Sequence, residues 1–143
     1  MKLTYSGVID LLGDNDRVFA LLGNPEFLIK SIPDVENSKR LDDRSFEAVI
    51  KLKLSIVSSS IRTLIQIREA TKDSVVIHAS GSGGGSSIAL LISFQRNPKE
   101  IRWSADAEVS GLISGLGSSI LNTFAKRKIE ETIRSIQKAA AIV

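Results

Sequence analysis

The C-terminal stretch VSGLISGLGSSILNTFAKRKIEETIRSIQKAAAIV, residues 109–143, carries the strongest structural signal in the chain. It contains no proline, and its apolar residues recur at steps of three, four or five positions, which is typical of an amphipathic helix. These residues are Leu116, Ile120, Leu121, Phe124, Ile129, Ile133 and Ile136. Such a helix extends roughly 40 Å at 1.5 Å per residue, further than the radius of a small domain. We therefore expect it to lie across a surface built by the residues before it.

Those earlier residues predict a single antiparallel sheet. Apolar and polar side chains alternate from Leu3 to Leu11, which indicates a half-buried first strand. Two short helices follow at 18–22 and 27–29, and the second begins with the capping sequence Asn24-Pro25-Glu26. Alternation then continues through about six strands as far as Gly111. The expected order is strand, two short helices, strands and long helix, which is an α+β domain.

Length and composition restrict the class of protein. The chain has 143 residues, a length typical of one domain, so we treat 1–143 as a single unit. The net charge is +3, but the longest basic run, Lys126-Arg127-Lys128, is soon followed by Glu130-Glu131. We read this run as a solvated helix face, with contact to anionic lipid as the alternative. A basic face interleaved with aromatic residues is missing, which argues against a nucleic-acid partner.

Location and cofactors follow from residue types. The chain has no cysteine, which excludes disulfides and thiolate metal sites and fits a cytoplasmic protein. No apolar run is long enough to span a bilayer, so we expect any membrane contact to be peripheral. The single histidine, His78, falls at a polar strand position, and the segment 81–87 lacks the lysine of a phosphate-binding loop. We predict no catalytic residue, no metal and no cofactor.

A long helix covering one curved sheet leaves a space between the two, and this space is the candidate site. The apolar stripe of the helix turns by roughly 100–150° between its first and second halves, at about 100° per residue. Either the two halves face different surroundings, a cavity and the main core, or one helix follows a twisted sheet. The side chains that we expect to line the cavity are Phe27, Leu28, Ile32, Phe46, Ile50, Trp103, Leu116, Ile120 and Phe124.

Several short motifs together resemble the G-subunit family of carbon monoxide dehydrogenase, within the START-like (SRPBCC, helix-grip) superfamily. The family's proline-acidic step corresponds to Asn24-Pro25-Glu26, and its Ile-Pro-Gly corresponds to Ile32-Pro33-Asp34, with aspartate in place of glycine. Its Val-Ser-Gly strand end and the Leu-x-x-Leu-Gly-type segment correspond to Val109-Ser110-Gly111 and to 112–117. The family's late aromatic pair is replaced by Thr132-Ile133. The resemblance covers essentially the whole chain.

The resemblance implies a helix-grip fold and a non-enzymatic carrier or accessory protein that binds a hydrophobic, lipid-like or quinone-like molecule. It also implies a molybdenum hydroxylase and the inner face of the membrane as partners. Two alternatives stay open. One is an enzyme, a cyclase or hydrolase, that acts on an apolar substrate in the same cavity, although Tyr5 is almost the only ionisable residue at an inward position. The other is an interaction module whose cavity is closed.

Overall fold

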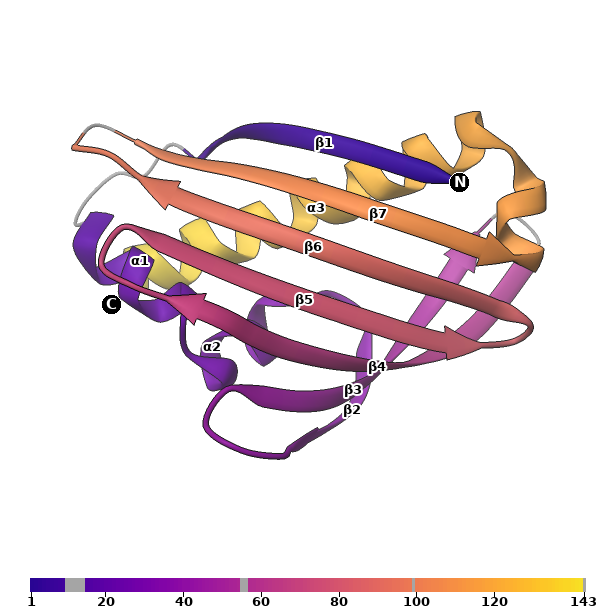
Figure 1. Cartoon of the computed structure of the whole chain (residues 1–143), viewed down its shortest axis with the longest axis horizontal. Coiled ribbons are helices and arrows are strands. Elements are labelled where there is room, and N and C mark those ends of the chain that lie inside the picture. Colours follow the sequence, from indigo (N-terminus) through magenta and orange to yellow (C-terminus); the bar gives the residue numbers. More distant parts are fainter. Residues whose placement is uncertain (10–14, 55–56, 99, 143) are drawn as a thin grey trace.

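The computed structural model describes residues 1–9, 15–54, 57–98 and 100–142 (Figure 1). The elements follow the predicted order of one strand, two short helices, six further strands and a long helix. They are β1 (Lys2–Ile9), α1 (Asn15–Leu22), α2 (Pro25–Ser31), β2 (Val35–Arg40), β3 (Ser45–Leu54), β4 (Val57–Ala70), β5 (Ser74–Gly83), β6 (Ser86–Arg96), β7 (Ile101–Gly111), the 3-10 helix η1 (Leu112–Leu116) and α3 (Ser118–Ile142). The predicted α+β class and antiparallel sheet are confirmed.

All seven strands form one antiparallel sheet in the order β1-β7-β6-β5-β4-β3-β2. The consecutive strands β2 to β7 pair as neighbours, and the first strand joins the last, with Tyr5 opposite Ala105. Figure 1 shows α3 running along one face of the sheet, with α1 and α2 near its C-terminal half. That face carries the apolar side chains of each strand, because side chains alternate between the two faces.

The core divides into two apolar clusters, and α3 contributes to both. The larger cluster includes Phe46 and Ile101, each 0% exposed, together with Ile136 from the C-terminal half of α3. The smaller cluster consists of Leu3, Leu54, Val109, Ile113 and Leu121, with Leu116 and Phe124 packed against it. The rotation of the apolar stripe therefore has a structural cause. The two halves of α3 pack on different clusters at opposite ends of the sheet.

The connection between β7 and α3 is the short helix η1, set between two glycines with positive φ. Gly111 has φ +85°, and a Cβ atom there would overlap the carbonyl oxygen of Gly85. Ile113 N donates to the buried Ser86 Oγ over 3.0 Å, which ties η1 to the start of β6. Gly117, with φ +90°, then separates η1 from α3. The glycines turn the chain sharply back over the sheet before the helix begins.

Replacing Gly111 by alanine tests this turn. We expect Gly111→Ala to lower the free energy of unfolding by about 1–3 kcal/mol, because the residue must keep a strained backbone conformation and its Cβ has no room. Urea denaturation measures the change. Gly115→Ala is the matched control, because no atom lies within 4 Å of its added Cβ, and we expect a change within about 0.5 kcal/mol. Equal losses in both variants would contradict this role of Gly111.

Candidate functional site

A cavity of about 310 Å³ lies between the inner face of the sheet and the helices α2 and α3. The strands β3 to β7 form one wall with apolar side chains such as Ile50, Ile65 and Trp103. The helices and the residue after α2 form the other wall, with Leu28, Ile32, Phe124, Ile129, Ile133 and Ile136. A largely apolar cavity of this size is typical of a binding site for a small molecule.

Short side chains in the sheet leave this space open. Ala79 on β5 and Ala105 on β7 point inward under α3 and line the cavity. Trp103 fills the neighbouring region because its ring lies over Gly7, where a Cβ atom would come within 2.9 Å of the indole. The Nε1 atom of Trp103 is buried without a hydrogen-bond partner. The sheet wall of the cavity thus combines the large Trp103 ring with alanine side chains that leave most of the cavity empty.

Five of the nine side chains expected at the cavity do line it: Leu28, Ile32, Ile50, Trp103 and Phe124. The other four do not. Phe27 and Phe46 are buried in the larger cluster, Leu116 packs against the smaller cluster, and Ile120 is 40% exposed. The cavity lies under residues 124–136 of α3, whereas the space below its first turns is filled by the smaller cluster. Ligand contact by the five remains a prediction.

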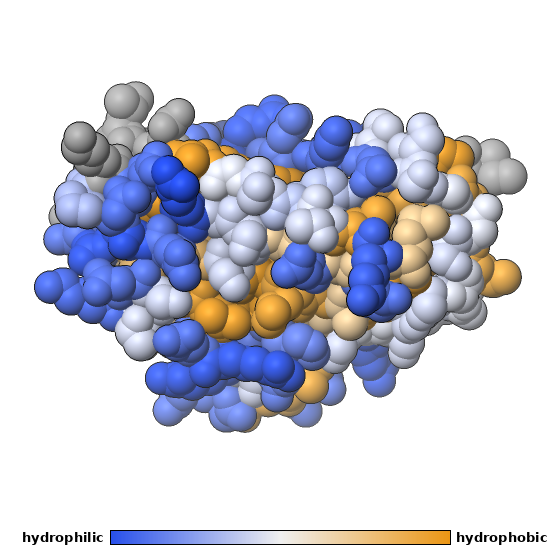
Figure 2. Space-filling model, turned by 45° about the horizontal axis from the view of Figure 1, so that its top comes forward, coloured by the Kyte–Doolittle hydropathy of each residue, from blue (hydrophilic) through white to orange (hydrophobic). Residues whose placement is uncertain are grey.

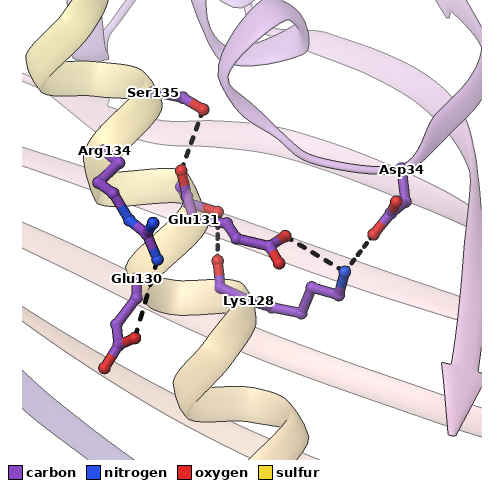
Figure 3. Close-up of polar contacts among 7 residues, drawn as sticks. Asp34, Lys128, Glu130, Glu131, Arg134 and Ser135 are labelled. Atoms are coloured by element: carbon purple, nitrogen blue, oxygen red, sulfur yellow. Dashed lines mark hydrogen bonds and ion pairs between the residues drawn. The ribbon is translucent and has the colours of Figure 1, made fainter.

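Two charged residues at this cavity, Asp34 and Lys128, were not predicted from the sequence. Lys128 Nζ donates to Asp34 Oδ2 and, over 3.2 Å, to Glu131 Oε2 (Figure 3). Asp34 follows α2, so its contact with Lys128 joins the segment after α2 to the middle of α3. We refer to these three residues as the Asp34–Lys128–Glu131 bridge. The spacing of Lys128 and Glu131 within one helix signals their pairing, but nothing in the sequence indicates the contact with Asp34.

The bridge lies at a partly exposed part of the cavity wall, which we refer to as the mouth of the cavity. The side chains of Lys128 and Asp34 are 27% and 43% exposed, in contrast to the buried Ile65 and Ile77 at the sheet wall. Lys128 Nζ also lies 5.6 Å from the centre of the Phe124 ring. Burial disfavours the charged form of Lys128, but the hydrogen bonds to Asp34 and Glu131 outweigh this effect and raise the pKa of the ammonium above its usual 10.5.

The hydroxyl groups along the cavity wall are already hydrogen-bonded to the backbone. Ser31 Oγ donates to the Phe27 carbonyl over 2.9 Å, and Thr132 Oγ1 donates to the Lys128 carbonyl over 2.8 Å. Thr63 Oγ1 makes a longer contact, 3.4 Å, with the Ile61 carbonyl. Tyr5 lies elsewhere, against the smaller cluster. Its hydroxyl donates to Asn122 Oδ1 over 2.6 Å, and burial raises its pKa.

The described residues provide no cluster of histidine, aspartate and glutamate side chains able to hold a metal ion. His78 is half-buried on the outer face of β5, opposite Gln66 and Leu91. The segment 81–87 forms the end of β5, the turn at Gly84 and Gly85, and the start of β6. Chemically, the cavity is therefore suited to enclosing apolar surface, with a single charged cluster at its mouth.

The outer surface is mixed in character. On the face drawn in Figure 2, apolar surface is visible in the middle of the molecule, between hydrophilic side chains above and below. Leu112 on η1 is 71% exposed, the largest exposure among the large apolar side chains of the described residues. Even the longest of the described helices, α3, carries too many charged residues to span a bilayer.

Comparisons with known proteins agree on the fold. A family model described as the G subunit of carbon monoxide dehydrogenase (CoxG) matches residues 7–141. A conserved protein from Geobacillus kaustophilus has 21% identity and a TM-score of 0.83, covering 97% of this chain and 95% of that one. A START superfamily protein from Mycobacterium smegmatis has 8% identity and a TM-score of 0.65, covering 98% and 97%. The ZhuI aromatase/cyclase from Streptomyces sp. R1128 has 6% identity and a TM-score of 0.67, covering 99% and 93%. No curated protein sequence matches the chain.

The raised pKa of Lys128 predicts how the bridge depends on pH. Because the folded-state pKa lies above 10.5, the stabilisation is complete below that pH and is lost as the pH rises through the folded-state value. We expect Lys128→Met to lower the free energy of unfolding by about 0–1 kcal/mol at neutral pH, since the groups are partly exposed. The difference from the wild type should hold to about pH 9 and shrink above 10.5. Thermal unfolding across this pH range measures it, with Lys126→Met on the exposed face of α3 as control. A difference that grew with rising pH would contradict the assignment.

Proposed function

Because the chain belongs to the CoxG family of carbon monoxide dehydrogenase subunits, we propose that it is a non-enzymatic carrier of a hydrophobic small molecule, lipid-like or quinone-like. The observation that carries the proposal is the apolar cavity of about 310 Å³ between the sheet and α3. Its wall is apolar, and the hydroxyls beside it are occupied by backbone carbonyls. A guest would therefore be held mainly by burial of its own apolar surface.

The strength of such binding suits a carrier. Each 100 Å² of apolar ligand surface removed from water contributes about 2.5 kcal/mol. Part of this gain offsets the lost freedom of the bound molecule. A cavity of this size therefore supports reversible binding of a small guest, and a carrier must release its guest as well as take it up.

An enzyme in the same cavity is the alternative, because one structural neighbour is described as an aromatase/cyclase. A general base or acid works best when its pKa lies near the operating pH. The pKa of Lys128 is shifted in the opposite direction, and Tyr5, with its pKa also raised, packs outside the cavity. Among the described residues of the wall, no other ionisable group except Asp34 is available. These features favour a carrier over a catalyst.

Family membership also supports a partner and a location. We propose that the chain serves a molybdenum hydroxylase of the carbon monoxide dehydrogenase type and contacts the membrane surface only peripherally. A third possibility, an interaction module with a closed cavity, is less well supported, because the Asp34–Lys128–Glu131 bridge at one end of the cavity is partly exposed.

The fluorescence of Trp103, the only tryptophan, provides a direct test. We expect the neutral probe N-phenyl-1-naphthylamine to quench Trp103 emission saturably, because the indole borders the cavity. Ala79→Phe fills the cavity from β5 and should weaken probe binding by about tenfold or more. Ala89→Phe, on the outer face of neighbouring β6, should bind the probe as the wild type does.

Thermal unfolding of each variant establishes that it remains folded. Absence of saturable quenching in the wild type would refute the carrier proposal. Equal quenching in the wild type and in a folded Ala79→Phe variant would show that the probe binds elsewhere, and would also count against it.

A further inference from the structure

The Asp34–Lys128–Glu131 bridge lies at the mouth of the cavity, where the side chains of Lys128 and Asp34 are partly exposed. Among the described residues that line the cavity, Lys128 is the only cation and Asp34 the only anion. Figure 3 shows the Lys128 side chain reaching from α3 toward Asp34, with Glu131 beside it. A guest at the mouth therefore meets a polar cluster assembled from two separate elements.

The charge of this cluster is unfavourable to anions. One ammonium group is shared by two carboxylates, so the bridge carries a formal net charge of −1 (one positive and two negative charges). The hydrogen bonds that raise the pKa of Lys128 are made to these carboxylates. An anionic head group would have to displace Asp34 or Glu131 from Lys128 while repelled by both.

The backbone of Asp34 has a conformation in which a residue with a side chain is uncommon. Asp34 is the only described residue other than glycine with positive φ, +63°. Its position is where the resembled family has the glycine of Ile-Pro-Gly, the residue best suited to that conformation. Aspartate adopts this conformation more readily than most other residues that carry a side chain, and here its carboxylate makes the contact with Lys128.

We infer that Asp34 and Glu131 determine ligand specificity: by occupying Lys128, they restrict the cavity to uncharged apolar molecules and exclude those with a carboxylate, sulfonate or phosphate head group. This inference rests on the proposed function and deepens it, because it names the class of ligand. The bridge selects uncharged ligands because it repels anionic ones. The cation at the mouth is already paired, so the apolar wall alone attracts the guest.

Two probes with the same aromatic skeleton test the inference. N-phenyl-1-naphthylamine is neutral, and 8-anilinonaphthalene-1-sulfonate carries a sulfonate. We expect the wild type to bind the neutral probe at least about tenfold more tightly, measured by saturable quenching of Trp103. Asp34→Asn combined with Glu131→Gln removes both negative charges beside Lys128 and should improve sulfonate binding by about tenfold, with neutral-probe binding changed less than about twofold. Asparagine tolerates the positive φ of residue 34.

Adding Lys128→Met to this double variant should abolish the gain in sulfonate binding. This result would show that the gain comes from the charge of Lys128 and not from a wider opening. Equal affinity of the wild type for both probes would overturn the inference and leave the carrier proposal standing. An unchanged preference in the folded double variant would also overturn it. Failure of both probes to quench Trp103 would refute the carrier proposal, and the inference with it.

Discussion

The long helix α3 is held at its two ends by different apolar clusters, and the rest of the structure depends on this arrangement. Near its start, Leu121 packs with Ile113 and Val109 in the smaller cluster. Further along, Ile136 is buried in the larger cluster. Between these points the helix passes over Ala79 and Ala105, whose side chains are too short to fill the space. The larger cluster itself surrounds the cavity, since Ile65, Ile77 and Ile136 belong to it and line the space left beside the two alanines.

Hydrophobic burial contributes more to the free energy of folding than the Asp34–Lys128–Glu131 bridge does. Burial of one large apolar side chain contributes about 1.5–3 kcal/mol, and each cluster contains several. A partly exposed ion pair contributes about 0–1 kcal/mol. The clusters therefore fix the position of α3, whereas the Lys128 contacts are weak enough to open without unfolding the domain.

The order of elements could be predicted from the sequence because each element has a local signal. The alternation in β1, the cap at Asn24 and the periodicity of α3 are all properties of neighbouring residues.

The position of the cavity along α3 was predicted less well. Periodicity predicts the side of the helix on which Ile120 or Phe124 lies. It does not predict whether other side chains fill the space between that turn of the helix and the sheet. Here Leu54 and Ile113, distant in sequence, fill the space below the first turns. Aromatic residues illustrate the same limit, since Phe46 and Trp103 both lie on inner faces of strands. Phe46 is fully buried in the larger cluster, whereas Gly7 accommodates the Trp103 ring beside the cavity.

The pairing of Asp34 with Lys128 joins residues that are 94 positions apart in the sequence, so only the folded chain reveals it. It also explains how a cavity with few polar features discriminates between guests. An apolar wall favours any molecule that buries hydrocarbon, and it discriminates poorly among them. A fully paired charge cluster adds selectivity without adding attraction, because a second anion gains little from an ammonium already held by two carboxylates. On this inference, the paired charges of Asp34, Lys128 and Glu131 supply the discrimination against anions that the apolar wall lacks.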